Sequence, residues 1–225
     1  MLKFVQKHKK DVPLLFTLKI HTFMKANLSS QIKLDRTPKR YYRPANAFER
    51  TALTRFEKIQ TEIYESTEEG SSQIAKEVSD LIRNRKKEGR FCVMALGSGP
   101  GTHSVYKELV RLHRDEKLSF SNVIVFNISE FYPLDETAPG TTRILQETLL
   151  NQVDIDPTNV FTPRGTTEKE GVFEFCKEYE KSIENYGGLD LALLEIGPLG
   201  NLGFNEPGSQ ANSSTRLMLI GSESR

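Results

Sequence analysis

The chain of 225 residues is long enough to bury a sizeable hydrophobic core, and its 37% hydrophobic and 27% charged residues are typical of a globular protein. Lys and Arg number 31 against 30 Asp and Glu, so the formal net charge of +1 gives no argument for nucleic-acid binding from bulk charge. No apolar run is long enough to cross a bilayer. We therefore expect a cytoplasmic protein that binds neither nucleic acid nor membrane.

The first 60 residues are expected to be a basic leader and a polar arm, separate from a domain of residues 61–225. A short apolar stretch near the start is interrupted by Lys19 and His21, and no small-residue cleavage site follows, so it does not fit a signal peptide. The arm contains Pro38 and Pro44, and a short helix is predicted around Ala47–Ile59.

The first helix of the domain is predicted to begin at Ser66, which forms a capping box with Glu69, and to end at Gly89. Apolar side chains at helical spacing mark its buried face. Strands and helices then alternate along the chain. The predicted elements are a strand at 91–96, a helix at 102–114, a strand at 122–127, a helix at 142–152, a strand at 159–162, a helix striped by Val172, Phe173, Cys176, Tyr179 and Ile183, a strand from Leu189, and a last strand candidate at 215–220.

This alternation predicts an α/β fold with a doubly wound, mostly parallel, Rossmann-like sheet and helices on both faces. The two cysteines, Cys92 and Cys176, lie inside predicted elements without metal-ligand spacing. They indicate a pair of buried free thiols, and neither a metal nor a cofactor is expected.

A glycine-rich loop, residues 97–102, joins the first strand to its helix. Backbone amides at such a helix start can bind phosphate, and Ser98 and Thr102 add hydroxyl donors. The spacing is G-x-G-x-G, not G-x-G-x-x-G, and no acidic residue lies at a second strand end about twenty residues on, which disfavours a dinucleotide. A phosphate site and a purely structural turn both remain open.

Two further loops follow strands. Asn127, Ser129 and Glu130 end the second strand, where they can bind a polyol or simply cap the strand and the turn. The strand from Leu189 runs into a glycine-rich loop that carries Glu206. His103 has no partner evident in the sequence. A second histidine, His113, is predicted to be solvated at a helix C-terminus.

From Ile63 to Arg225 these segments together resemble the glucosamine-6-phosphate deaminase family, also called glucosamine-6-phosphate isomerase. The resemblance implies an open α/β fold, a homo-oligomer, a phosphosugar ligand, and conversion of glucosamine 6-phosphate to fructose 6-phosphate and ammonia. It rests on residues 96–102, on the strand at 122–127 with Glu130 after it, on Tyr179–Gly188, on Gly203–Ser209, and on Ser214-Thr215-Arg216.

The resemblance also assigns roles to residues. Glu206 and Glu130 are the catalytic candidates, with Glu130 adjacent to the position of the base that removes the C2 proton. Arg216 matches an arginine that binds an allosteric phosphosugar. The substrate-binding candidates are Gly97, Ser98, Gly99, Thr102, Ser129, Asn201 and Asn205.

Three catalytic positions depart from the family pattern. Ser129 stands at the position of the C2 base, while Leu199 and Asn201 replace an Asp and a His that open the sugar ring together with a Glu. Because each acid–base group contributes roughly 10²–10⁴ in rate, we expect phosphosugar binding with weak or no catalysis. Two alternatives are an active enzyme in which Glu206, Glu130 or His103 moves the protons, and a nucleotide-binding module.

The family's later strands and lid would follow Arg225. The sheet is therefore expected to be incomplete, with unpaired edges. We expect the chain to be a truncated product or the front of a longer polypeptide.

Overall fold

The structure is a computed structural model that describes residues 46, 48, 61–134, 139–197, 200–206, 208–210 and 212–221. It divides the chain into two units, one of residues 8–65 and one of residues 1–7 with 66–225. The predicted leader, arm and short helix at Ala47–Ile59 lie almost wholly outside the described residues. The second unit contains the sheet, and the domain boundary at residue 60 stays a prediction.

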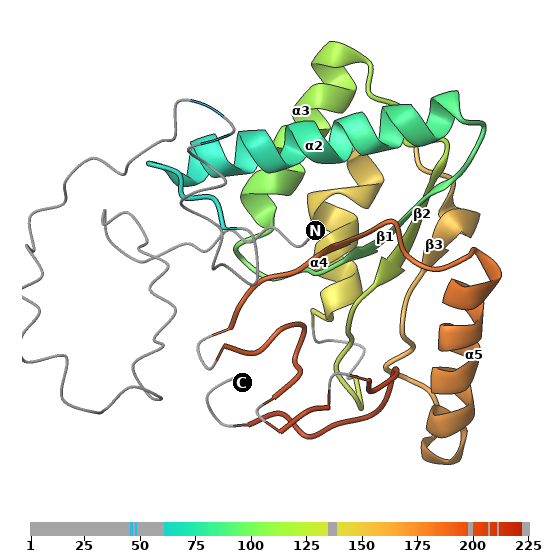
Figure 1. Cartoon of the computed structure of the whole chain (residues 1–225). Coiled ribbons are helices and arrows are strands. Elements are labelled where there is room, and N and C mark those ends of the chain that lie inside the picture. Colours follow the sequence, from blue (N-terminus) through green and yellow to red (C-terminus); the bar gives the residue numbers. More distant parts are fainter. Residues whose placement is uncertain are drawn as a thin grey trace, which may run out of the picture. The chain divides into compact units, whose positions relative to one another are not determined.

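The described sheet has four parallel strands in the spatial order β3-β2-β1-β4 (Figure 1). Leu96 lies opposite both Asn127 and Leu193, so the carboxyl ends of three strands are level. The chain runs outward from β1 to β3 and then returns to β4 on the far side of β1. The strand order therefore reverses between β1 and β4, the place where open α/β sheets bind ligands. The strands are β1 (Cys92–Leu96), β2 (Val123–Asn127), β3 (Val160–Phe161) and β4 (Leu191–Leu193).

Helices cover both faces of this sheet, as predicted (Figure 1). Alternate strand residues such as Met94 and Val125 face a core shared with three helices, whereas Ile124 and Phe126 face the other side. Among the described helices, those on the first side are α2 (Thr67–Lys87), α3 (His103–Glu116) and α4 (Thr141–Thr148), and the one on the second side is α5 (Val172–Asn185). Short 3-10 turns occupy Leu150–Gln152, Pro157–Asn159 and Lys169–Gly171.

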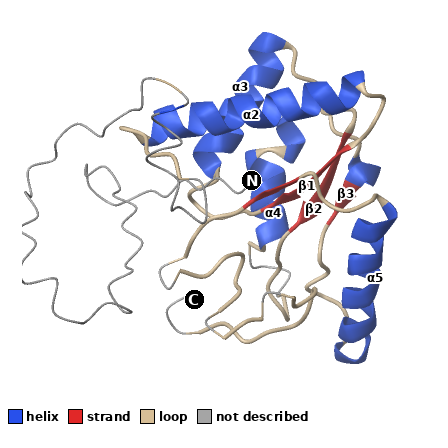
Figure 2. Cartoon of the chain, viewed as in Figure 1, coloured by secondary structure: helices blue, strands red, loops and turns tan. Residues whose placement is uncertain are grey.

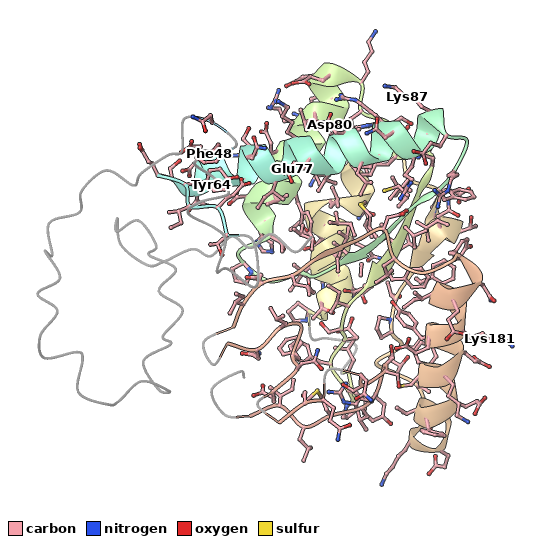
Figure 3. The ribbon with its side chains drawn as sticks, in the orientation of Figure 1. Phe48, Tyr64, Glu77, Asp80, Lys87 and Lys181 are labelled. Carbon is pink, nitrogen blue, oxygen red and sulfur yellow. The ribbon has the colours of Figure 1, made fainter. Side chains whose placement is uncertain are left out.

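Helix α2 forms as its sequence predicts. The Ser66 side chain accepts the Glu69 amide at 3.0 Å, and Gly89 adopts φ +68° just after the helix, a conformation that favours glycine. Ile74 and Ile82 are buried. Asp80 and Lys87 of α2, like Lys181 of α5, point away from the sheet (Figure 3). The N-terminal cap by Ser66 and the apolar spacing are both confirmed.

Helix α5 is tied to the sheet by one side chain. The Tyr179 hydroxyl contacts two carbonyl oxygens at strand ends, Asn127 O at 2.8 Å and Phe161 O at 3.0 Å. The prediction that Phe173 belongs to the buried stripe is wrong, because its side chain is 71% exposed. Positions 172, 176, 179 and 183 share one face at helical spacing, and residue 173 lies one step off that face. Phe175 packs against the core instead.

The last predicted strand, residues 215–220, is also wrong. The segment is irregular and Leu219 is 91% exposed. A strand needs a neighbouring strand for its backbone, but the Thr215 amide donates to the Glu180 carboxylate of α5. Cys92 and Cys176 are buried free thiols, as predicted. Among the described helices, none is long and apolar enough to cross a membrane.

Candidate functional site

The loops that follow the strands lie beyond one end of the sheet (Figure 2). They bring most of the predicted site residues together in two places. The first is the glycine loop, residues 97–102 after β1. The second is a cavity of about 740 Å³ that we call the arginine cavity, because Arg164 and Arg216 line it. Ile128 lines the cavity and lies 3.7 Å from where a Cβ on Gly97 would be, so the two places adjoin.

Two side chains, one from the N-cap residue of α3 and one from the helix itself, hydrogen-bond to carbonyl oxygens of the glycine loop. Thr102 Oγ1 donates to Gly99 O at 2.8 Å, and the buried Tyr106 hydroxyl donates to Gly97 O. The Thr102 hydroxyl, predicted as a ligand donor, is thus used within the loop. Across the described ranges, the amides of Ser98 and Gly99 have no protein acceptor, so they remain available for a ligand.

A carboxylate absent from the predicted site lies on this loop. The Gly101 amide donates to Glu195 Oε1 at 2.7 Å, and a Cβ on Gly99 would overlap the same carboxylate. Burial raises the pKa of Glu195, and the Gly101 hydrogen bond and the His103 charge offset only part of that effect. The sequence did contain a signal for Glu195, because it is a charged residue directly after an apolar strand. In that stretch only Glu206 was proposed as a site residue.

The arginine cavity gathers four of the predicted residues, namely Ser129, Glu130, Asn205 and Arg216. Its wall also contains apolar side chains, including Phe131 and Phe204, whose ring centroids are 5.9 Å apart. Phe204 adopts φ +62°, a left-handed conformation that is uncommon for a bulky residue. Such a cavity is of the size that binds small organic ligands.

Glu130 is fixed as a cap of helix α4. Its Oε1 accepts the amides of Phe131 and Thr141 at 2.9 Å each, and its Oε2 accepts the Thr142 amide at 3.0 Å. Burial acts to raise the pKa of Glu130, but the hydrogen bonds from Thr142, Phe131 and Thr141 outweigh it and lower that pKa. A carboxylate held in this way is a weak proton acceptor, so the geometry favours the capping role that the sequence left open.

Arg216 is braced by the loop that carries Glu206. Its Nη2 atom lies 2.9 Å from Asn205 Oδ1 and 3.1 Å from Ser209 Oγ. The segment before it is anchored on α5, since Thr215 Oγ1 donates to Glu180 at 2.6 Å. The second cation of the cavity, Arg164, was not predicted and lies 6.0 Å from the Phe175 ring centroid. Its only signal was its place shortly after β3.

Two predicted residues lie outside both places. Asn201 is buried against Gly197, and Glu206 faces Gly221, where an added Cβ would be 3.5 Å from Glu206 Oε2. In the described part of the chain, Asn201 Oδ1 and Glu206 Oε1 are buried without a hydrogen-bond partner. Leu199 lies outside the described residues.

The two domain histidines differ from their predicted settings. His103 is exposed and acts electrostatically on Glu195. His113, expected in solvent, is half-buried, with Nδ1 2.6 Å from Leu118 O. Within the described ranges, no group of three or more His, Cys, Asp or Glu residues is placed to hold a metal ion.

Sequence comparison identifies relatives. The family model of glucosamine-6-phosphate isomerases/6-phosphogluconolactonase matches residues 61–202. A glucosamine-6-phosphate deaminase-like protein of Bacteroides thetaiotaomicron is 56% identical over 203 residues, which are 90% of this chain and 31% of that protein. The glucosamine-6-phosphate deaminase of Dictyostelium discoideum is 34% identical over 164 residues, 72% of this chain and 61% of the relative. The chain thus spans less than two thirds of these relatives.

Solved structures share the fold. A monomeric glucosamine-6-phosphate deaminase aligns with a TM-score of 0.66 at 28% identity, covering 71% of this chain and 64% of that one. The 6-phosphogluconolactonase of Trypanosoma brucei aligns at 0.53 with 18% identity, covering 66% and 64%. The parallel α/β layers are therefore those of these proteins, whereas the homo-oligomer stays a prediction.

Proposed function

Because this chain belongs to the family of glucosamine-6-phosphate isomerases and 6-phosphogluconolactonases, we propose that it binds a phosphosugar and turns it over weakly or not at all. The bound ligand lies at the carboxyl ends of the strands. One observation carries the binding part of the proposal: a loop with free backbone amides adjoins a cavity with two arginines.

The chemistry of the two places fits a phosphorylated polyol. Free amides after β1 suit a phosphate group, and Arg216 adds a planar donor set in the adjoining cavity. Ser129 and Asn205 line the cavity and can hydrogen-bond sugar hydroxyls. The volume of about 740 Å³ accommodates a hexose phosphate.

Weak catalysis follows from the groups at the expected catalytic positions. Serine at position 129 is a poor base near neutral pH, and the neighbouring Glu130 is occupied by three backbone amides. Asn201 cannot titrate, and Leu199 carries no polar group. Among the groups at these expected positions, Glu206 is left as the candidate for proton transfer, although ring opening and the C2 shift need several coordinated groups.

A second candidate function is an active isomerase or deaminase with relocated acid–base groups. The observation that favours it is Glu195, because a half-buried carboxylate with a raised pKa beside His103 suits a general acid or base. Glu130 suits this role less well, since its pKa is lowered.

Calorimetry on the purified chain tests the binding proposal. We expect glucosamine 6-phosphate to bind more tightly than glucosamine, and nucleotides such as ATP to bind more weakly. Tighter binding of ATP than of the phosphosugar would favour the nucleotide-binding alternative. Release of ammonia and fructose 6-phosphate at rates typical of the family would refute the weak-catalysis part and leave the binding part standing.

A further inference from the structure

Helix α3 begins at the glycine loop without an acidic residue of its own. Its first turn contains no Asp or Glu, and the side chain of its N-cap residue, Thr102, makes no capping hydrogen bond. A carboxylate from a distant strand end takes that place, since Glu195 accepts the Gly101 amide at 2.7 Å. The helix start therefore already has an anion beside it.

The fit between Glu195 and the loop is close. A Cβ on Gly99 would overlap both the carboxylate carbon and its oxygens, so glycine at this position makes room for the side chain. Glu195 lies just after β4 and the loop just after β1, at the reversal of strand order. The carboxylate thus lies where a ligand anion would enter.

Charge at this place argues against simple phosphate binding. The glycine loop itself contains no Lys or Arg, and among the described residues the titratable groups that interact electrostatically with Glu195 are His103 and Tyr106, both on α3. A phosphate placed on the loop would meet a carboxylate at close range without a compensating arginine there. Two like charges at such close range repel each other even near a protein surface, and this repulsion disfavours anionic ligands at the loop.

We propose that Glu195 determines the charge of the ligand that the glycine loop accepts. Its carboxylate occupies the place of a bound ligand anion until a ligand displaces that carboxylate. This inference rests on the proposed function, because it concerns the same phosphosugar site. A phosphorylated ligand must move the Glu195 carboxylate off the Gly101 amide, and this displacement reduces the ligand's binding affinity. An unphosphorylated sugar does not have to displace the carboxylate. Glu195 thereby reduces the difference in affinity by which the site favours sugar phosphates over unphosphorylated sugars.

The test compares the whole chain with Glu195→Gln and Glu195→Ala, and with Glu184→Gln as a control that removes an exposed carboxylate from α5. The probes are inorganic phosphate, glucosamine 6-phosphate and glucosamine, titrated by calorimetry at constant ionic strength. Gln keeps the size and an acceptor oxygen, and Ala removes both, so a folding defect in one variant leaves the other informative.

We expect both Glu195 variants to bind phosphate and glucosamine 6-phosphate at least about tenfold more tightly than the unmodified chain. Glucosamine affinity and the Glu184→Gln control should stay unchanged. Equal affinity of all forms for glucosamine 6-phosphate would overturn the inference and leave the proposed function intact. Binding by the Glu195 variants alone would support the inference and refute phosphosugar binding by the natural chain. Absence of binding in every form would overturn both.

Discussion

The glycine loop and the arginine cavity adjoin at the same end of the sheet, but their charged groups differ: the loop has one carboxylate on it, whereas two arginines, Arg164 and Arg216, and two glutamates, Glu130 and Glu180, line the cavity. The loop carries the half-buried Glu195 on one of its amides. The cavity contains Arg164 and Arg216, and one of its carboxylates, Glu130, is bonded to backbone amides. In the proposed ligand site, sheet topology sets the position of the two loops, and side chains distant in sequence set the charged groups that each part contains.

The largest expected effect comes from removing the charge of the cavity. Arg216→Ala should weaken phosphate binding in the cavity by roughly tenfold to a hundredfold, because a hydrogen bond to a charged group contributes about 1.5–3 kcal/mol. Chemical-shift mapping during a phosphate titration separates the Asn205 signals from those of Gly101. Arg143→Ala, which removes an exposed arginine of α4, is the control. Equal losses of phosphate affinity in Arg216→Ala and Arg143→Ala would show that the cavity arginine contributes no more to phosphate binding than an arginine of α4 outside the cavity.

Glu130→Gln tests whether this carboxylate is a structural cap. We expect unfolding free energy at pH 7 to fall by about 1–2 kcal/mol, as for loss of a helix cap. The pKa of Glu130 is lowered in the folded state, so its stabilisation is present above the ordinary value of 4.5 and is lost as pH falls through the folded value.

Urea unfolding across that pH range should therefore show that the difference in unfolding free energy between the unmodified chain and Glu130→Gln shrinks in acid. Glu147→Gln, on an exposed ion pair of the same helix, should change stability by less than about 0.5 kcal/mol. A gap that widens in acid would rule out the capping account.

Gly99→Ala should displace Glu195 from the loop, because the new methyl group would overlap its carboxylate. The expected cost is about 1 kcal/mol for one charge-assisted hydrogen bond in a half-buried setting, with a large shift of the Gly101 amide resonance. Gly171→Ala is a suitable control, since its Cβ would lie 3.5 Å from Thr167 Cγ2, an ordinary contact. An unmoved Gly101 resonance would show that the carboxylate is not held there.

The smallest expected effect is on stability in Glu195→Gln. The pKa of Glu195 is raised, so its ionised form is less favourable in the folded state, and stability falls as pH rises through that pKa. The Gln variant should lack this dependence and gain a few tenths of a kcal/mol at neutral pH relative to the unmodified chain. Urea midpoints of the unmodified chain and of Glu195→Gln from pH 4 to pH 8 measure this difference in stability. A Gln variant that loses as much stability with rising pH as the unmodified chain would contradict the prediction.

Much of the fold follows from local sequence. Ser66 caps α2, and period-two apolar residues in β1 and β2 supply both faces of the sheet. Local reasoning failed where a tertiary partner decides. Phe173 lies one position off the buried face of α5, and the Thr215 amide, at the start of the predicted strand 215–220, donates to Glu180 of that helix instead of to a strand.

The site was predicted less completely, because its contacts span long sequence separations. Gly101 and Glu195 are 94 residues apart, and no motif relates them. Arg164 likewise reaches the cavity from a loop without a recognisable pattern. In contrast, Ser129 was predicted because it follows a strand end, and Asn205 because it belongs to a specific Phe-Asn-Glu-Pro segment.

The most direct test of the central claim is a single-sample measurement of binding and turnover with glucosamine 6-phosphate. Calorimetry gives the dissociation constant, and a coupled assay on the same sample gives the rate of ammonia release. The account predicts saturable binding with ammonia release at or near background. Saturable binding with turnover at a rate typical of the family would contradict it.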